Sequence, residues 1–278
     1  MAVIAFIDQA TWTSSTMRYA AWAAISLDQP LSIVAREASQ DSDPVVDFDA
    51  YQSMDAREDM FRELSVRSQS DPPQTDTAAF EIVQSAARKA RDFGVEKVRT
   101  TTTSEPFPWY IENSTDSGDL LVMPRQDDPE SSSRQWLDQF LKVRSRVMLA
   151  VPERYSPVES WLIALDGKPS TGRAVDFLCN HELLKHAQGT AVFVGNDYQN
   201  RIHFRDAVRH LASSGHKVKS HELQGNADDV LSAVLAVSPV DLLIMGAYGQ
   251  GRFRLLNERS TTSRLLKDFR GPVLVARA

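Results

Sequence analysis

Short apolar stretches alternate along the chain with longer stretches whose apolar residues recur at helical spacing. In the second half the apolar stretches predict strands, at 160–166, 190–196, 216–222, 241–246 and 272–276. The stretches between them predict helices, near 170–187, 200–214, 226–237 and 260–269. Strands that are apolar throughout are typical of a sheet covered on both faces. Alternation of strands and helices therefore predicts an α/β fold with a parallel sheet and right-handed crossovers.

The chain contains this pattern twice. Three segments of the first half match segments of the second half in the same order: 2–8 with 160–167, 119–123 with 241–245, and 145–151 with 271–277. The first pair brings an aspartate to the end of each strand, Asp8 and Asp166, and the second pair reads "DLLVM" and "DLLIM". Three matches in one order indicate an internal repeat, so both halves are expected to share one fold.

The repeat also indicates where the domains meet. Two prolines interrupt the pattern in "PERYSPVE", residues 152–159, so we expect domains at 1–151 and 152–278. Each is predicted to be a doubly wound parallel-sheet α/β domain of about five strands. The first domain is longer because of an acidic segment near 37–76, which we interpret as a solvated insertion with one helix around 49–65.

Charge differs between the halves. Residues 1–150 carry 24 acidic and 15 basic side chains, whereas residues 151–278 carry 13 and 16. Nucleic acid is a poor partner for such a chain, because phosphate backbones are bound by a basic stripe. No apolar run approaches the ~18 residues of a membrane helix, and the amino terminus shows no leader. With Cys179 as the single cysteine, this favours a cytoplasmic protein that does not contact the membrane.

A glycine-rich loop follows the fourth predicted strand of the second half, within "DLLIMGAYGQGRFRLLNERSTTSRLL" (241–266). It is not a P-loop, because Arg252 and Phe253 stand where that motif has Lys and Ser or Thr. Nor is it a dinucleotide fingerprint, since Arg254 stands where the third glycine belongs. The position still favours an anion, because ligands bind beyond the carboxyl ends of strands where the winding reverses. A tight turn followed by a capped helix is the alternative interpretation.

The loop resembles the nucleotide loop of the universal stress protein family. Members carry a G-x2-G-x9-G-[ST] signature after their fourth strand and an Asp at the end of the first. Here Gly246 and Gly249 are followed, after nine residues, by Arg259 and Ser260. The resemblance covers both halves and implies a tandem, Rossmann-like member of the universal stress protein type. The ATP or AMP site that it implies consists of Asp166, Val194, Gly246, Gly249, Gly251, Arg259, Ser260 and Thr261.

Arg259 is the main departure from this family pattern. In nucleotide-binding members the Asp matching Asp166 lies on the adenine side, and the residue matching Val194 meets adenine through its backbone. The signature glycine that Arg259 replaces lets the backbone approach the phosphates. An arginine here either reaches a phosphate with forked hydrogen bonds or fills the phosphate position itself.

The first half departs further, because its loop is missing. Pro124 follows "DLLVM" and supplies no N–H, and the acids Asp127, Asp128 and Glu130 come next. Negative charge at this place would repel a phosphate. We therefore expect the first domain to keep the fold without a nucleotide site.

The resemblance also implies how the domains pack. In the strand order of this family the fifth strand is a sheet edge, and both candidates, "RVMLAV" and "PVLVAR", are apolar. Bare apolar edges invite aggregation. We expect these two strands to pair with each other about a pseudo-twofold axis.

Other candidate sites are weaker. The six histidines all lie in the second half without the H-x-x-x-H spacing of a helical metal site, so no metal ligands are predicted. The aromatics of "EPFPWYIE" (105–112) are interpreted as packing in preference to a stacking platform for bases. No nucleophile, base and orienting acid form a triad, so no catalytic residue is assigned.

These observations favour a stress-response protein that binds or senses ATP or AMP through its second domain. Mg²⁺ would accompany ATP, and a homodimer is expected from the resemblance. The alternative is a nucleotide-free interaction protein in which both sites are degenerate and the acidic segment or the arginine-bearing loop meets a protein partner. A slow ATP hydrolase is the third possibility.

Overall fold

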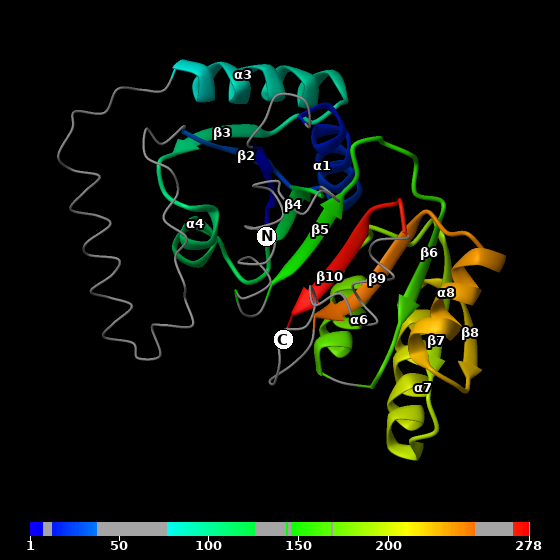
Figure 1. Ribbon diagram of the computed structural model, residues 1–278. Helices are drawn as coiled ribbons and strands as arrows, with labels where there is room; N and C mark the ends of the chain where they lie inside the picture. Colours follow the sequence, from blue (N-terminus) through cyan, green and yellow to red (C-terminus); the bar gives the residue numbers. More distant parts are fainter. Residues whose placement is uncertain are drawn as a thin grey trace, which may run out of the picture.

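The computed structural model describes residues 1–7, 13–37, 77–125, 143, 146–167, 169–247 and 269–277. Their strands form one ten-stranded sheet with helices on both faces, shown in Figure 1. Asp8, the predicted helix at 49–65 and residues 260–268 of the predicted last helix lie outside the described residues. The predicted α/β fold with its parallel strands is confirmed.

The first half contains five strands and three of the described helices. In chain order these are β1 (Val3–Ile7), α1 (Thr13–Leu27), β2 (Leu31–Arg36), α3 (Thr77–Asp92), β3 (Val98–Thr103), α4 (Phe107–Ser114), β4 (Leu120–Pro124) and β5 (Val147–Val151). Strands β1, β4 and β5 are buried at every position, as their apolar sequences require.

The second half repeats this order. Its elements are β6 (Ser160–Ala164), α6 (Pro169–Asn180), β7 (Gln188–Val194), α7 (Tyr198–Ser213), β8 (Lys217–Leu223), α8 (Ala227–Val237), β9 (Leu242–Ala247) and β10 (Val273–Arg277). All five strands lie within two residues of their predicted bounds. The helix predicted at 170–187 is wrong at its end, because α6 stops at Asn180. Short-range bonds such as Ala187 N–H to Leu184 O, 3.1 Å, turn the chain there and place both leucines of "HELLKHAQG" in the core.

The two half-sheets join through their last strands. The strand order is β3-β2-β1-β4-β5-β10-β9-β6-β7-β8, and β5 and β10 pair antiparallel whereas the other pairs are parallel. The predicted pairing of these two strands is confirmed. In each half the chain moves outward from the first strand to the second and third. It then returns to the other side of the first strand for the fourth and fifth, so each half is doubly wound.

Register is the same in the two halves. Ala5 of β1 lies between Ile33 and Val122, and the equivalent residue of β6, Ile163, lies between Ala191 and Ile244. Val122 and Ile244 in turn adjoin Leu149 and Leu274, which pair with each other across the seam. Equivalent residues that face each other lie on a pseudo-twofold axis, as predicted.

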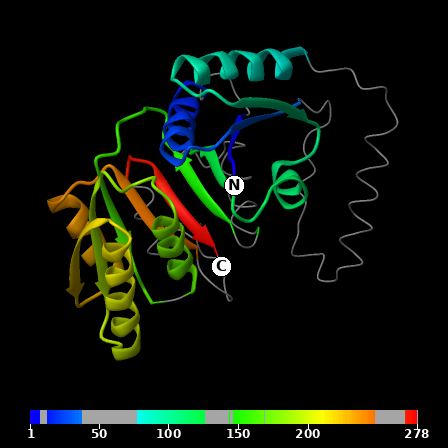
Figure 2. The same ribbon diagram turned by 180° about the vertical axis from the view of Figure 1, so that it is seen from behind.

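Two apolar clusters cover the two faces of the sheet. Helices α1, α3, α6 and α7 pack on one face, where the larger cluster runs through both halves. Helices α4 and α8 pack on the other face with residues such as Phe107 and Leu231. Figure 2 shows the same arrangement from behind, with α6 and α7 seen directly. We call the face that carries α4 and α8 the second face.

The segment between the halves is fixed against α1. Ser15 Oγ donates to Pro152 O at 2.6 Å, and Ser156 N–H donates to Tyr19 Oη at 3.1 Å. The Tyr155 ring lies 4.7 Å from that of Tyr19. These contacts tie the connection to the first half.

Candidate functional site

The winding of the second half reverses between β6 and β9. From β6 the chain moves outward to β7 and β8, and it then returns to β9 on the other side of β6. Crossover helices leave a crevice at such a point, beyond the carboxyl ends of the strands. The candidate site is therefore expected at the ends of β6, β7 and β9.

Three predicted site residues meet at this point. Ala164 of β6 is flanked by Val192 of β7 and Met245 of β9. Two residues beyond Ala164 comes Asp166, and two residues beyond Val192 comes Val194. Gly246 follows Met245 directly. The pairing continues past the end of β6, because Leu165 N–H donates to Val192 O at 2.9 Å. The register therefore places Asp166 and Val194 at one level of the sheet, with Gly246 on β9 one residue before that level.

Asp166 has a defined orientation. The Thr171 hydroxyl, at the start of α6, donates to Asp166 Oδ1 at 3.0 Å, and Thr171 is itself buried. This bond fixes the carboxylate at the end of β6. Sequence reasoning did not include Thr171, although a threonine five residues after a strand-ending aspartate could have indicated it.

Gly167 lets two loops meet beside Asp166. Its φ is +75°, and a Cβ at this position would lie 3.0 Å from the Cα of Asn200. A larger residue would be strained and would push away the start of α7. Asp197 caps that helix by accepting from Asn200 N–H at 2.7 Å. The end of β7, with Val194, is thereby connected to a helix start of fixed position.

Five predicted site residues lie outside the described residues: Gly249, Gly251, Arg259, Ser260 and Thr261. Their part in the site remains a prediction.

The end of β4 in the first half, which is equivalent to the end of β9, contacts the second half. Pro124 ends β4 where Gly246 stands in β9, and Arg125 follows it. Arg125 is buried, and its guanidinium donates to the backbone oxygens of Gly271, at 3.2 Å, and Phe269. At this point the first half has a proline and an arginine that contacts the opposite half, whereas the second half has the glycine that begins its glycine-rich stretch. Asp127, Asp128 and Glu130 lie outside the described residues.

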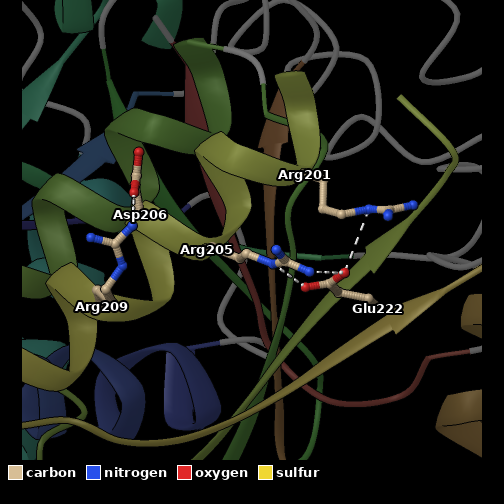
Figure 3. A network of polar contacts seen from close by, with 5 residues as sticks. All are labelled: Arg201, Arg205, Asp206, Arg209 and Glu222. Carbon is tan, nitrogen blue, oxygen red and sulfur yellow. Dashed lines mark hydrogen bonds and ion pairs between the residues drawn. The ribbon is translucent and has the colours of Figure 1, made fainter. Parts of the chain in front are cut away.

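A network of charged side chains connects α7 with β8 in the second half. Figure 3 shows Glu222 of β8 held by Arg205 through a bond of 2.6 Å and a second of 3.0 Å, with Arg201 at 3.5 Å. The hydrogen bond from Arg205 lowers the pKa of Glu222. This exposed network joins α7 to the end of the outermost strand, where Glu222 pairs with Phe193 of β7.

The remaining candidate groups give no catalytic arrangement. Burial raises the pKa of the Cys179 thiol, which disfavours the reactive thiolate. Within the described part of the chain, no group of three or more His, Cys, Asp and Glu residues could hold a metal ion. The helices described there include none that is long and apolar enough to cross a membrane.

Comparisons with known proteins concern the fold and the sequence of the whole chain. No protein-family model matches the chain. A universal stress protein of Synechocystis sp. is 22% identical over 279 residues, which cover 97% of both chains. The crystal structure of a universal stress protein from Archaeoglobus fulgidus covers 99% of this chain and 96% of its own, with a TM-score of 0.61 and 13% identity.

Two further structures share the fold. That of a putative universal stress protein from Pseudomonas aeruginosa covers 99% of this chain and 92% of its own, with a TM-score of 0.56 and 15% identity. The cytoplasmic domain of a prokaryotic cation chloride cotransporter reaches a TM-score of 0.56 at 8% identity, covering 99% of this chain and 95% of its own. The fold alone thus occurs in proteins of different roles. In sequence and in fold, the chain is similar along its whole length to proteins of the universal stress protein family.

Proposed function

We propose that the protein binds an adenine nucleotide, ATP or AMP, at the carboxyl ends of β6, β7 and β9. The observation that supports the proposal is that Asp166, Val194 and Gly246 stand within one residue of the same level of the sheet, at the point where the winding reverses. This is the order in which a base, a ribose and a phosphate would be met from β7 to β9.

The chemistry of the described residues supports such a ligand. The Asp166 carboxylate, oriented by Thr171, can accept from ribose hydroxyls or from an exocyclic amine. Gly246 begins the glycine-rich stretch, and glycine permits close approach of the backbone N–H groups to an anion. Mg²⁺ would arrive with ATP and would be held by its phosphates.

Calorimetric titration with ATP and AMP tests the proposal. We expect Asp166→Ala to weaken nucleotide binding about tenfold or more, because it removes a charged acceptor. Asp206→Ala, which removes an exposed carboxylate of α7 that pairs with Arg209, is the matched control. If the wild type binds neither nucleotide, the proposed function is wrong.

Titration of variants at Arg259 is the second part of this test. If its side chain contacts the phosphates, Arg259→Ala weakens binding, because a forked donor is lost. If it fills the phosphate position, the wild type does not bind and Arg259→Gly creates binding. The second result would contradict the proposal for the natural protein.

The first half is proposed to bind no nucleotide, since Pro124 lacks an N–H and Arg125 is engaged with the opposite half. A stoichiometry of one nucleotide per chain is therefore expected. Binding of two nucleotides per chain, one of which is lost when Pro124 is substituted, would contradict this expectation.

A nucleotide-free interaction protein is the second candidate. The replacement of a signature glycine by Arg259 and the loss of the loop in the first half both favour it. Native mass spectrometry of freshly purified protein separates the two, because a co-purifying nucleotide supports binding. Turnover of ATP in the same preparation would support slow hydrolysis. The division at residue 151 and a homodimer are further proposals, tested by expressing 152–278 alone and by light scattering.

A further inference from the structure

Two neighbouring polar atoms in the core of the second half have no hydrogen-bond partner in the described part of the chain. They are Trp161 Nε1 and His216 Nδ1. The two residues are 0% and 4% exposed, and their rings lie 5.8 Å apart at an interplanar angle of 88°. Most buried polar side-chain atoms have a partner, because an unpaired one keeps the full cost of leaving water. The two atoms therefore point to a shared partner that the chain itself does not supply.

The Trp161 ring reaches His216 because the strand between them has a glycine at this level. Trp161 of β6 pairs with Gly189 of β7, which in turn pairs with Val218 of β8. A Cβ at Gly189 would lie 2.3 Å from the indole ring, so the ring lies directly over this residue. The indole nitrogen is a donor only. Trp161 therefore offers an N–H to the space beside His216.

The His216 ring is fixed by a contact with α6. Its Nε2 lies 2.9 Å from Leu178 O, and its backbone N–H donates to Leu211 O at 3.1 Å. Because a carbonyl oxygen only accepts, Nε2 carries a proton. In the neutral ring the other nitrogen, Nδ1, is then an acceptor. Trp161 and His216 therefore present one donor and one acceptor.

We propose that one buried water molecule joins Trp161 and His216, accepting from the indole N–H and donating to His216 Nδ1. A buried water needs at least about two polar partners and room for a small molecule. Gly215, next to His216, leaves such room, because a Cβ there would meet only Lys185 Cδ, at 3.9 Å.

The water site belongs to the second half alone. In the first half Val3 and Leu31 occupy the positions of Trp161 and Gly189, and the exposed Glu96 occupies that of His216. The water connects β6 with α6 and with the start of the outer strand β8. It lies at the amino ends of these strands, whereas the candidate nucleotide site lies at their carboxyl ends. The inference is therefore independent of the proposed function.

Nuclear magnetic resonance of the isotope-labelled protein tests the site. We expect long-range proton–nitrogen spectra to show the His216 proton on Nε2. We also expect the indole proton of Trp161 to show a rotating-frame Overhauser contact with a long-lived water molecule. A proton on Nδ1 alone, or an indole proton without a water contact, would overturn the inference. A scalar coupling between Trp161 Nε1–H and His216 Nδ1 would overturn it as well, because it would show a direct hydrogen bond.

Trp161→Phe removes the donor and keeps an aromatic ring. In this variant we expect the Nδ1 resonance of His216 to shift and the equilibrium constant for unfolding to rise about tenfold, because a buried hydrogen bond is lost. Trp22→Phe is the matched control, since Trp22 of α1 is half-buried and packs beside Tyr19. It should leave the His216 resonance unchanged. An unchanged resonance in Trp161→Phe would contradict the water site, and if that variant does not fold, the spectra of the wild type decide.

Discussion

The two halves place their strands in the same register, yet they differ where the fourth strand ends. β4 ends in Pro124 and is followed by the buried Arg125, whereas β9 runs through Gly246 into the glycine-rich stretch. Buried strand interiors must keep shape and polarity to pack, but strand ends carry little of that packing. The comparison indicates that two half-sheets of the same fold can differ at the end of the fourth strand, and that in the first half this position takes part in joining the halves.

Arginine side chains form hydrogen bonds across the seam at both of its ends. Arg125 of the first half donates to carbonyl groups of the second half at one end of the seam. Arg173 of the second half donates to Ser117 O of the first half at the other end. These arginines do not occupy equivalent positions of the repeat, so the seam is symmetric in its strands and asymmetric in its charged contacts.

The largest effect is expected from breaking the seam on the side of the first half. Arg125→Met should lower the free energy of unfolding by about 3 kcal/mol, because two carbonyl groups lose a charged donor in a buried place. Urea denaturation measures the change. Arg88→Met, at an exposed position of α3, should stay within about 0.5 kcal/mol of wild type. Equal stability of the two variants would show that the seam does not depend on Arg125.

A difference inside the cores gives the second prediction. The pair of Val3 and Leu31 in the first half corresponds to Trp161 and Gly189 in the second. A Cβ at Gly189 would lie 2.3 Å from the buried Trp161 ring, so Gly189→Ala should destabilise the protein by about 2 kcal/mol in thermal or chemical unfolding.

Gly172 supplies the matched control for this substitution. A Cβ there meets nothing within 4 Å, so Gly172→Ala in α6 should stabilise the protein by about 0.5 kcal/mol. A Gly189→Ala variant as stable as wild type would mean that the tryptophan side chain moves aside without cost.

The repeated aspartates of "DLLVM" and "DLLIM" give the third prediction. Asp119 accepts from Ala2 N–H at 2.7 Å, and Asp241 accepts from the equivalent Ser160 N–H at 2.8 Å. Each therefore ties its fourth strand to the first. Asp119→Ala and Asp241→Ala should each cost about 1.5 kcal/mol of unfolding free energy by urea denaturation. Asp92→Ala, at an exposed site of α3, is the control, and a cost in only one half would refute equivalent roles.

The smallest effect concerns the outer strands. β3 has Thr102 where β8 has Glu222, whose pKa is lowered by the hydrogen bond from Arg205. Because the folded pKa lies below the ordinary value of 4.5, the stabilisation by Glu222 is present above that pH and is lost as the pH falls through the folded pKa. Carboxyl NMR should show a low titration point that Arg205→Gln raises and Arg209→Gln leaves unchanged. An unchanged titration in Arg205→Gln would contradict the assignment.

The sequence by itself determined the repeat and the strands of the second half, whereas the pairing of the last strands was expected from the resemblance to the universal stress protein family. Runs such as "DLLIM" are apolar because both faces of a central strand are buried, and such a run can be recognised in the sequence without knowing which strands lie beside it. That Asp166, Val194 and Gly246, the residues implied by the resemblance, lie near one edge of the sheet could also be expected, because carboxyl ends of parallel strands gather there.

Only the tertiary structure decided how the halves contact each other and which side chains surround the site. The bonds of Arg125 and Arg173 depend on carbonyl groups of the opposite half, and no local pattern specifies such partners. The contact of Gly189 with Trp161 and the bond from Thr171 to Asp166 arise when separate segments fold to one place.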